Sequence, residues 1–193
     1  MGNWVFDKIS EHHSDVYDHQ KLVGTVELGI RYYHTDENKK GLFNKRKKLY
    51  IKQVDTIFRD VDHTVEVKSS CHLNQSTLMY DVFKRTFTYT KDGKKHEFEM
   101  IYHNQADLAR YYYSFEFNSD TYYVFFDNRY FNLELFKNKD FVGKWEQTKK
   151  TQFTYEVETF YEEHKWLWFS IFSHLYSHFP RASSNYFIIP DTD

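Results

Sequence analysis

The segment that most constrains the fold is a run of apolar side chains from Lys165 to Phe179, which Pro180 follows. Read as a helix, these residues would extend for about 22 Å at about 1.5 Å per residue. Apolar side chains cover most of the helical circumference, which indicates burial on nearly all sides. A membrane span needs about 20 apolar residues, so this segment is too short for one. We interpret it as a core helix inside a sheet. The expected core residues are Trp166, Trp168, Phe169, Ile171, Phe172, Leu175 and Phe179.

Much of the remaining chain alternates between apolar and polar residues, as half-buried β-strands do. Aromatic residues, which favour strands, make up 21% of the chain, with 17 Tyr and 19 Phe. The clearest hairpin lies between Phe83 and Ile101, because Asp92-Gly93 is a type I′ turn sequence. The other expected strands are Leu22–Tyr33, Leu49–Phe58, 64–68, Thr77–Val82, Tyr111–Phe117, Tyr122–Phe126, Tyr130–Phe136, Phe141–Trp145 and Gln152–Phe160. Short, evenly spaced strands predict a mainly β fold, either an antiparallel barrel or a sandwich.

The length of 193 residues suits one domain, and we expect a single domain over residues 1–193. Residues 1–21 show no clear period and are expected to form a short helix or a loose lead-in segment. Residues 180–193 are expected to be a C-terminal tail, in which Asn185–Pro190 is either a last short strand or a surface segment.

Composition excludes some classes of function. The net charge of -2 argues against a dedicated nucleic-acid binder, which needs a clear basic excess. A single cysteine, Cys71, excludes an intramolecular disulfide framework and fits a reducing compartment. The segment Met1–Lys8 lacks the pattern of a secretory signal. We therefore expect a cytoplasmic protein without a transmembrane segment.

Several features near the end of the chain occur in a characteristic order. The strand with Phe141-Val-Gly-Lys144 precedes the alternating strand Phe153–Glu158, the acidic pair Glu162-Glu163 and then the hydrophobic helix. This order resembles the tubby C-terminal-like superfamily, which includes the LURP-one-related and phospholipid scramblase proteins. The resemblance covers roughly Leu49 to Phe179. It implies a closed antiparallel β-barrel of about twelve strands around a C-terminal hydrophobic helix. Tubby proteins bind phosphoinositides through basic residues, but no such motif matches this chain residue by residue.

A basic run is the strongest charge feature, and it lies in a segment that reads as a loop. Its members are Lys39, Lys40, Lys45, Arg46, Lys47 and Lys48. Four to eight such cations beside the apolar pair Leu42-Phe43 can bind anionic lipid headgroups, at about 1 kcal/mol each. The run is therefore our candidate site for an anionic membrane surface or a protein partner. The alternative is a solvated loop with no partner.

Other reactive residues do not form a catalytic or metal site in this reading. His174 and His178 share a helix face but have no third ligand, so we expect them to bond strand backbone or face solvent. Cys71 and His72 are neighbours in a strand and point to opposite faces. The acidic residues Glu156, Glu158, Glu162 and Glu163 read as a solvated surface. We expect a non-enzymatic binding or regulatory module without a cofactor.

A lipocalin-like carrier of a small apolar ligand is the alternative. Gly2-Asn-Trp4 and Gly143-Lys-Trp145 both match the tripeptide that opens the first strand of lipocalins. The position of the helix separates the two interpretations, because a helix inside the barrel occupies the space that a carrier's ligand would need.

Overall fold

The structure is a computed structural model, which describes residues 2–10, 12–35, 49–76, 79–105, 110–127, 132–149 and 152–178. The strands are β1 (Gly2–Ser10), β2 (His13–Asp18), β3 (Lys21–Thr35), β4 (Leu49–Asp60), β5 (Val65–Ser76), β6 (Met79–Lys91), β7 (Lys94–Gln105), β8 (Arg110–Phe117), β9 (Asp120–Asp127), β10 (Asn132–Lys137), β11 (Asp140–Lys149) and β12 (Gln152–Val157). A short 3-10 helix, η2 (Thr159–His164), leads into α1 (Lys165–His178).

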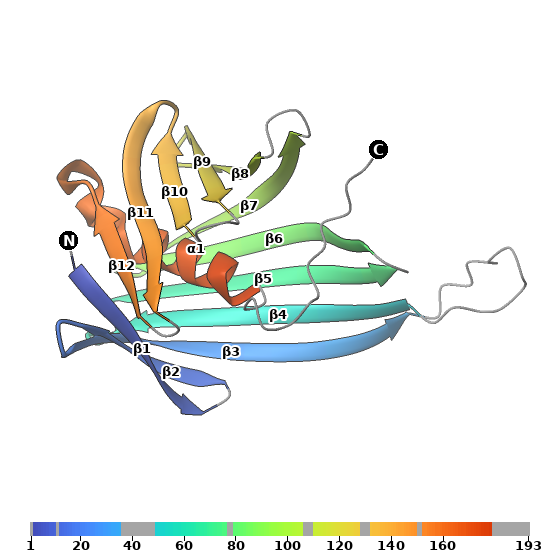
Figure 1. The fold of residues 1–193 in the computed structure, drawn as a ribbon, viewed down its shortest axis with the longest axis horizontal. Coiled ribbons are helices and arrows are strands. Elements are labelled where there is room, and N and C mark those ends of the chain that lie inside the picture. Colours follow the sequence, from blue (N-terminus) through green and yellow to red (C-terminus); the bar gives the residue numbers. More distant parts are fainter. Residues whose placement is uncertain are drawn as a thin grey trace, which may run out of the picture.

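The strands form a closed antiparallel barrel in which each strand pairs with its neighbours in the sequence (Figure 1). Pairing of β1 with β12 closes the barrel and places Trp4 opposite Phe153. The expected mainly β fold, with about twelve strands and a C-terminal helix, is therefore confirmed.

Residues 1–21 differ from the expectation of a short helix or a loose lead-in. They contain β1 and β2, and β1 is the strand that joins both ends of the meander. Only Val16 is fully buried on β2, and Trp4 is the buried residue among the two β1 side chains that the structure describes. Strand β2, with one fully buried position, lacks the alternation that identifies a strand in a sequence.

The hairpin expected between Phe83 and Ile101 is confirmed. Asp92 and Gly93 join β6 to β7 with φ angles of 50° and 76°, the two positive values that a type I′ turn requires. Of the expected strand Thr77–Val82, residues 79–82 are confirmed as part of β6, and residues 77 and 78 lie outside the described residues.

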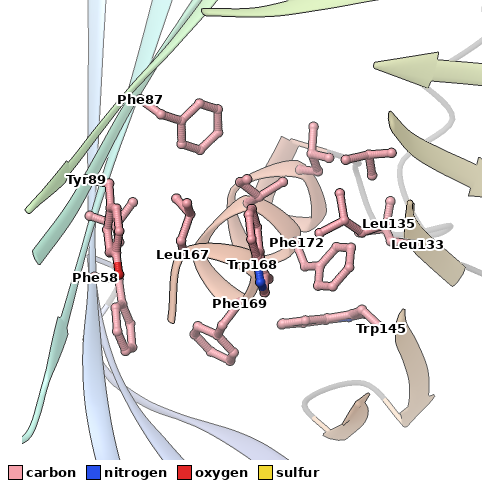
Figure 2. Close-up of a cluster of buried hydrophobic side chains, with 14 of the residues drawn as sticks. Phe58, Phe87, Tyr89, Leu133, Leu135, Trp145, Leu167, Trp168, Phe169 and Phe172 are labelled. Atoms are coloured by element: carbon pink, nitrogen blue, oxygen red, sulfur yellow. The ribbon is translucent and has the colours of Figure 1, made fainter. Parts of the chain in front are cut away.

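Helix α1 lies inside the barrel, and its consecutive residues from Leu167 to Leu175 each expose 4% of their surface or less. Its rings contact opposite walls. Trp168 lies 4.9 Å from Tyr122 on β9, and Phe169 lies 5.1 Å from Phe58 on β4, between ring centroids. Figure 2 shows Leu167 pointing toward the strands that carry Phe58, Phe87 and Tyr89, and Phe172 pointing toward Leu133, Leu135 and Trp145. Burial on every face explains why the helix is apolar nearly all round.

Candidate functional site

The residues predicted as core or as site fall into two groups. In the helix, Trp168, Phe169, Ile171, Phe172 and Leu175 are fully buried, and Trp166 is half-buried. Phe179 and the basic run Lys39, Lys40, Lys45, Arg46, Lys47 and Lys48 lie outside the described residues, the run falling between the end of β3 and the start of β4. The interpretation of the basic run as a binding site therefore stays a prediction.

An open cleft of about 430 Å³ lies at the end of the barrel where the chain enters α1. We call it the end cleft. It is formed by the β2–β3 turn, the β4–β5 turn, β1, β12 and the start of α1. Its lining comprises Trp4, Asp18, Lys21, Leu22, Val23, Asp60, Val61, Asp62, Tyr155, Glu156, Val157, Glu162, Lys165 and Trp166.

Three aromatic rings form one wall of the end cleft, and the core holds them in place. The Trp4 ring lies 5.2 Å from Tyr155 at an interplanar angle of 88°, and 5.8 Å from Trp166 at 74°. The Tyr155 hydroxyl donates a 2.5 Å hydrogen bond to the carbonyl of Lys165, which ties β12 to the first turn of α1. Burial raises the pKa of this hydroxyl well above its ordinary range, so Tyr155 stays a neutral donor. Trp4 also packs on Phe169, so the wall is continuous with the core.

Five carboxylates and two lysines line the end cleft, so it is formally negative. Three carboxylates have partners within the chain. Asp60 accepts hydrogen bonds from the Thr64 hydroxyl at 2.7 Å and the Val65 amide at 2.8 Å. Glu156 pairs with Lys144 at 3.3 Å, and Glu162 pairs with Lys165 at 3.1 Å.

Asp18 and Asp62 are less fully engaged. One oxygen of Asp18 is shielded from solvent and has no hydrogen-bond donor among the described atoms. Nε2 of the exposed His19 lies 3.8 Å from this oxygen. Asp62 is exposed in the β4–β5 turn, and the described part of the chain gives it no ion pair. These two side chains keep carboxylate charge available at the rim.

Lys165 already places an ammonium group beside the aromatic wall. Its Nζ lies 5.1 Å from the centroid of the Trp166 ring and 3.1 Å from Oε1 of Glu162. A distance below about 6 Å is within the range of a cation–π interaction. The same part of the end cleft therefore offers a ring face and a carboxylate to a cation.

A second polar cluster lies inside the barrel, where its three side chains are buried. Nδ1 of His174 is 2.6 Å from the Ser69 hydroxyl and 3.1 Å from the Thr56 hydroxyl. The spacing is that of a nucleophile and its base, but His174 is fully buried and Ser69 is 5% exposed, so a substrate has no access. The expectation that His174 faces solvent is wrong, because its side chain is fully buried, and its described hydrogen bonds join it to the hydroxyls of Ser69 and Thr56. The side chain of His178 lies outside the described set.

Cys71 and Arg85 occupy neighbouring positions on β5 and β6 in the same interior region. Burial raises the pKa of the Cys71 thiol, and the positive charge of Arg85 opposes part of that rise. A fully buried thiol with a raised pKa is a poor nucleophile. The Arg85 guanidinium lies 5.0 Å from the Tyr113 ring and donates to its hydroxyl at 3.3 Å.

Two further observations concern the described residues as a whole. None of their His, Cys, Asp and Glu side chains forms a group of three that is placed to hold a metal ion. No helix in the described part of the chain is long and apolar enough to cross a membrane.

Sequence reasoning did not find the end cleft, although it had noted two of its acids. Glu156 and Glu162 were interpreted as a solvated surface, and both line the cleft. Trp4 and Asp18 belong to the segment that showed no strand pattern. The one signal in the sequence was a tryptophan within a polar segment. Comparison of the chain with protein-family models, with curated proteins and with solved structures finds no match.

Proposed function

We propose that this protein is a non-enzymatic binding module of the tubby-like type, which binds a small ligand in the end cleft. The tubby-like assignment is supported by the closed twelve-stranded antiparallel barrel and by the position of its C-terminal helix. The residue order around Phe141–Lys144 supports it as well, because that strand leads through β12 and an acidic turn into α1.

The observation that carries the proposal is the burial of α1 inside the barrel from Leu167 to Leu175. A lipocalin-like carrier needs the space along the barrel axis for its ligand. Here Trp168, Phe169 and Phe172 take up that space. The end cleft lies outside this packed interior, and its volume of about 430 Å³ is within the range of small-molecule sites.

The absence of a catalytic role is also part of the proposal. The pair with catalytic spacing, Ser69 and His174, is enclosed in the core. Of the carboxylates that line the end cleft, Glu156 and Glu162 pair with lysines and Asp62 is exposed to solvent. In this proposal the accessible polar groups of the end cleft bind the ligand, and the buried pair Ser69 and His174 stabilises the core.

Blocking the end cleft tests the proposal. Val61 is 47% exposed at its rim, so Val61→Trp should fill the cleft without disturbing the core, and Val61→Ser is the matched control. Choline, succinate, AMP and the lipophilic dye N-phenyl-1-naphthylamine serve as probes, with calorimetric titration as the measurement. We expect at least one polar probe to bind the wild type and Val61→Ser but not Val61→Trp.

Two outcomes would overturn the proposal. If no probe binds in a manner that Val61→Trp prevents, the end cleft is not a binding site. If the dye binds with one-to-one stoichiometry and equal affinity in both variants, a carrier with an internal ligand is favoured instead.

Binding to an anionic membrane surface is a second candidate, favoured by the six cations between Lys39 and Lys48. Each cation near an anionic surface contributes about 1 kcal/mol. We expect the protein to sediment with vesicles that contain phosphatidylserine and not with pure phosphatidylcholine. A variant with all six cations replaced by alanine should stay in the supernatant. Equal sedimentation with both lipids would exclude this function.

A further inference from the structure

We infer that the end cleft is selective for a small organic cation with an alkylated ammonium group. The inference rests on the proposed function, since it names the ligand class of the same site. Four observations support it: the excess of carboxylates, the aromatic wall, the ammonium that the chain itself places there, and the lack of a metal-type ligand group.

Charge is the first observation. Five carboxylates face two lysines in one concave surface. A cleft lined mainly by one sign of charge concentrates ions of the opposite sign. Asp18 has one shielded oxygen without a hydrogen-bond donor among the described atoms, and Asp62 has no ion pair there. A bound cation would supply a hydrogen-bond or ion-pair partner to these two carboxylates.

The aromatic wall is the second observation. Trp4, Tyr155 and Trp166 all line the end cleft, and the Trp4 ring is steeply inclined to the other two, at 88° to Tyr155 and 74° to Trp166. Ring faces carry negative electrostatic potential, and tryptophan attracts cations most strongly. Alkylated ammonium groups bind such cages well because their methyl groups pack on the rings and they are weakly hydrated. The hydrogen bond from Tyr155 to Lys165 holds the wall in this shape before any ligand binds.

Lys165 is the third observation. Its ammonium lies at a cation–π distance from Trp166 and pairs with Glu162, so the end cleft already accommodates such a group. The Lys165 side chain is 38% exposed, so it can be displaced or removed at little cost to the core. The bound ligand and Lys165 would compete for the same ring and the same carboxylate.

The choice between an organic cation and a metal ion follows from the ligand groups. A hard metal cation needs about six to eight oxygen ligands around it. The described residues offer no cluster of three candidate metal ligands. Much of the end cleft is lined by aromatic rings, whose carbon atoms are not ligands for a hard metal cation. The N-terminus of α1 also lies at the end cleft, and the helix dipole there favours an anion. The experiment therefore includes an anionic probe.

Calorimetric titration with choline, with its uncharged carbon analogue 3,3-dimethylbutan-1-ol and with succinate tests the inference. We expect choline to bind about tenfold more tightly than the carbon analogue, since the two differ only in charge. Succinate should not bind. Asp62→Asn should weaken choline binding by about fivefold, and Glu134→Gln, on the exposed wall of β10, should leave it unchanged.

Lys165→Met provides a result of opposite sign. It keeps the aliphatic stem and removes the competing ammonium, so choline should bind more tightly than to the wild type. A merely structural role of Lys165 would not produce this gain. Circular dichroism of each variant confirms that the fold is kept.

The failure of this inference is distinguishable from that of the proposed function. If succinate or AMP binds and Val61→Trp prevents it, while choline does not bind, the ligand class is wrong and the end cleft remains a site. Equal affinity for choline and its carbon analogue also overturns the inference. If no probe binds in a manner that depends on the end cleft, both proposals are wrong.

Discussion

The hydroxyl group of Ser69, on strand β5, lies 2.6 Å from Nδ1 of His174 on the buried helix α1. Thr56 on β4 faces Ser69 in the barrel register, and its hydroxyl bonds both Ser69 and His174. Most of the side chains that the helix buries are apolar and make non-directional contacts, and the hydrogen bond from Tyr155 to Lys165 lies at its first residue. The polar contact between His174 and the wall therefore favours one rotation and one depth of α1 within the barrel, as buried polar groups do when they are satisfied.

Ser69→Ala is expected to lower the free energy of unfolding by about 1–2 kcal/mol, because it removes a partner from a buried imidazole. Ser114→Ala is the matched control: Ser114 pairs with His103 at 2.7 Å, but that pair is only half-buried. The control should change the free energy by about 0.5 kcal/mol or less. Urea unfolding measures both. Equal losses for the two variants would show that burial of the Ser69–His174 pair has no special effect.

Removal of a core ring tests the packing of α1 inside the barrel. Trp168→Ala and Phe172→Ala should each cost about 3–5 kcal/mol, because both residues are fully buried and the barrel wall cannot collapse onto the cavity. Phe160→Ala is the control, since Phe160 is 86% exposed and should change stability by about 0.5 kcal/mol or less. Urea unfolding followed by far-ultraviolet circular dichroism is the measurement. A loss below about 1 kcal/mol for both core variants would contradict the buried position.

The prediction of the helix from the sequence was accurate, because its composition leaves few alternatives. A segment that is apolar nearly all round requires partners on all sides. The expected helix Lys165–Phe179 and the observed Lys165–His178 begin at the same residue. The strands β8 to β12 were also predicted, because their buried residues alternate, as Tyr113, Phe115 and Phe117 do on β8.

The end cleft and the interior polar cluster were not predicted, for two different physical reasons. The cleft is assembled from segments distant in the sequence, such as Trp4, Val61 and Trp166, which only barrel closure brings together. The interior cluster could not be predicted because its residue types do not indicate burial. Threonine and serine are common on the outer face of a strand. The sequence pattern of β4 and β5 therefore does not reveal that Thr56 and Ser69 face inward.

Close packing between strands limits substitution at Gly24 on β3. A Cβ atom there would lie 2.5 Å from the Arg59 carbonyl oxygen and 2.7 Å from the Phe58 ring, so Gly24→Ala should cost about 1–3 kcal/mol. Gly29, on the same strand, is the control. Its nearest atom would be Cβ of Asp55 at 3.7 Å, so Gly29→Ala should change stability by about 0.5 kcal/mol or less.

Thermal and urea unfolding of the two alanine variants provide the comparison. The expected difference arises from the approach of β4 to β3, since both positions share a strand and the same substitution. Similar losses at Gly24 and Gly29 would mean that the close approach at Gly24 is relieved without cost.

His164 links stability to pH through its partly buried ring. Burial lowers the pKa of His164 from its ordinary value of 6.5, Lys91 and His96 lower this pKa further, and Glu163 opposes them. The ring packs on Phe117 and Trp168, and its Nδ1 lies 3.3 Å from the Tyr89 hydroxyl. The unfolded state therefore binds a proton at His164 more readily than the folded state does.

The sign of the effect follows from this difference in proton binding. A histidine whose pKa is lower in the folded state contributes no penalty above its unfolded pKa of 6.5, and destabilises the fold as pH falls below that value. The loss of stability between about pH 8 and about pH 5 should therefore be smaller in His164→Gln than in the wild type. Urea unfolding at both pH values gives the two losses, and His63→Asn, in the exposed β4–β5 turn, is the control. If His164→Gln loses as much stability on acidification as the wild type and the control, protonation of His164 does not contribute.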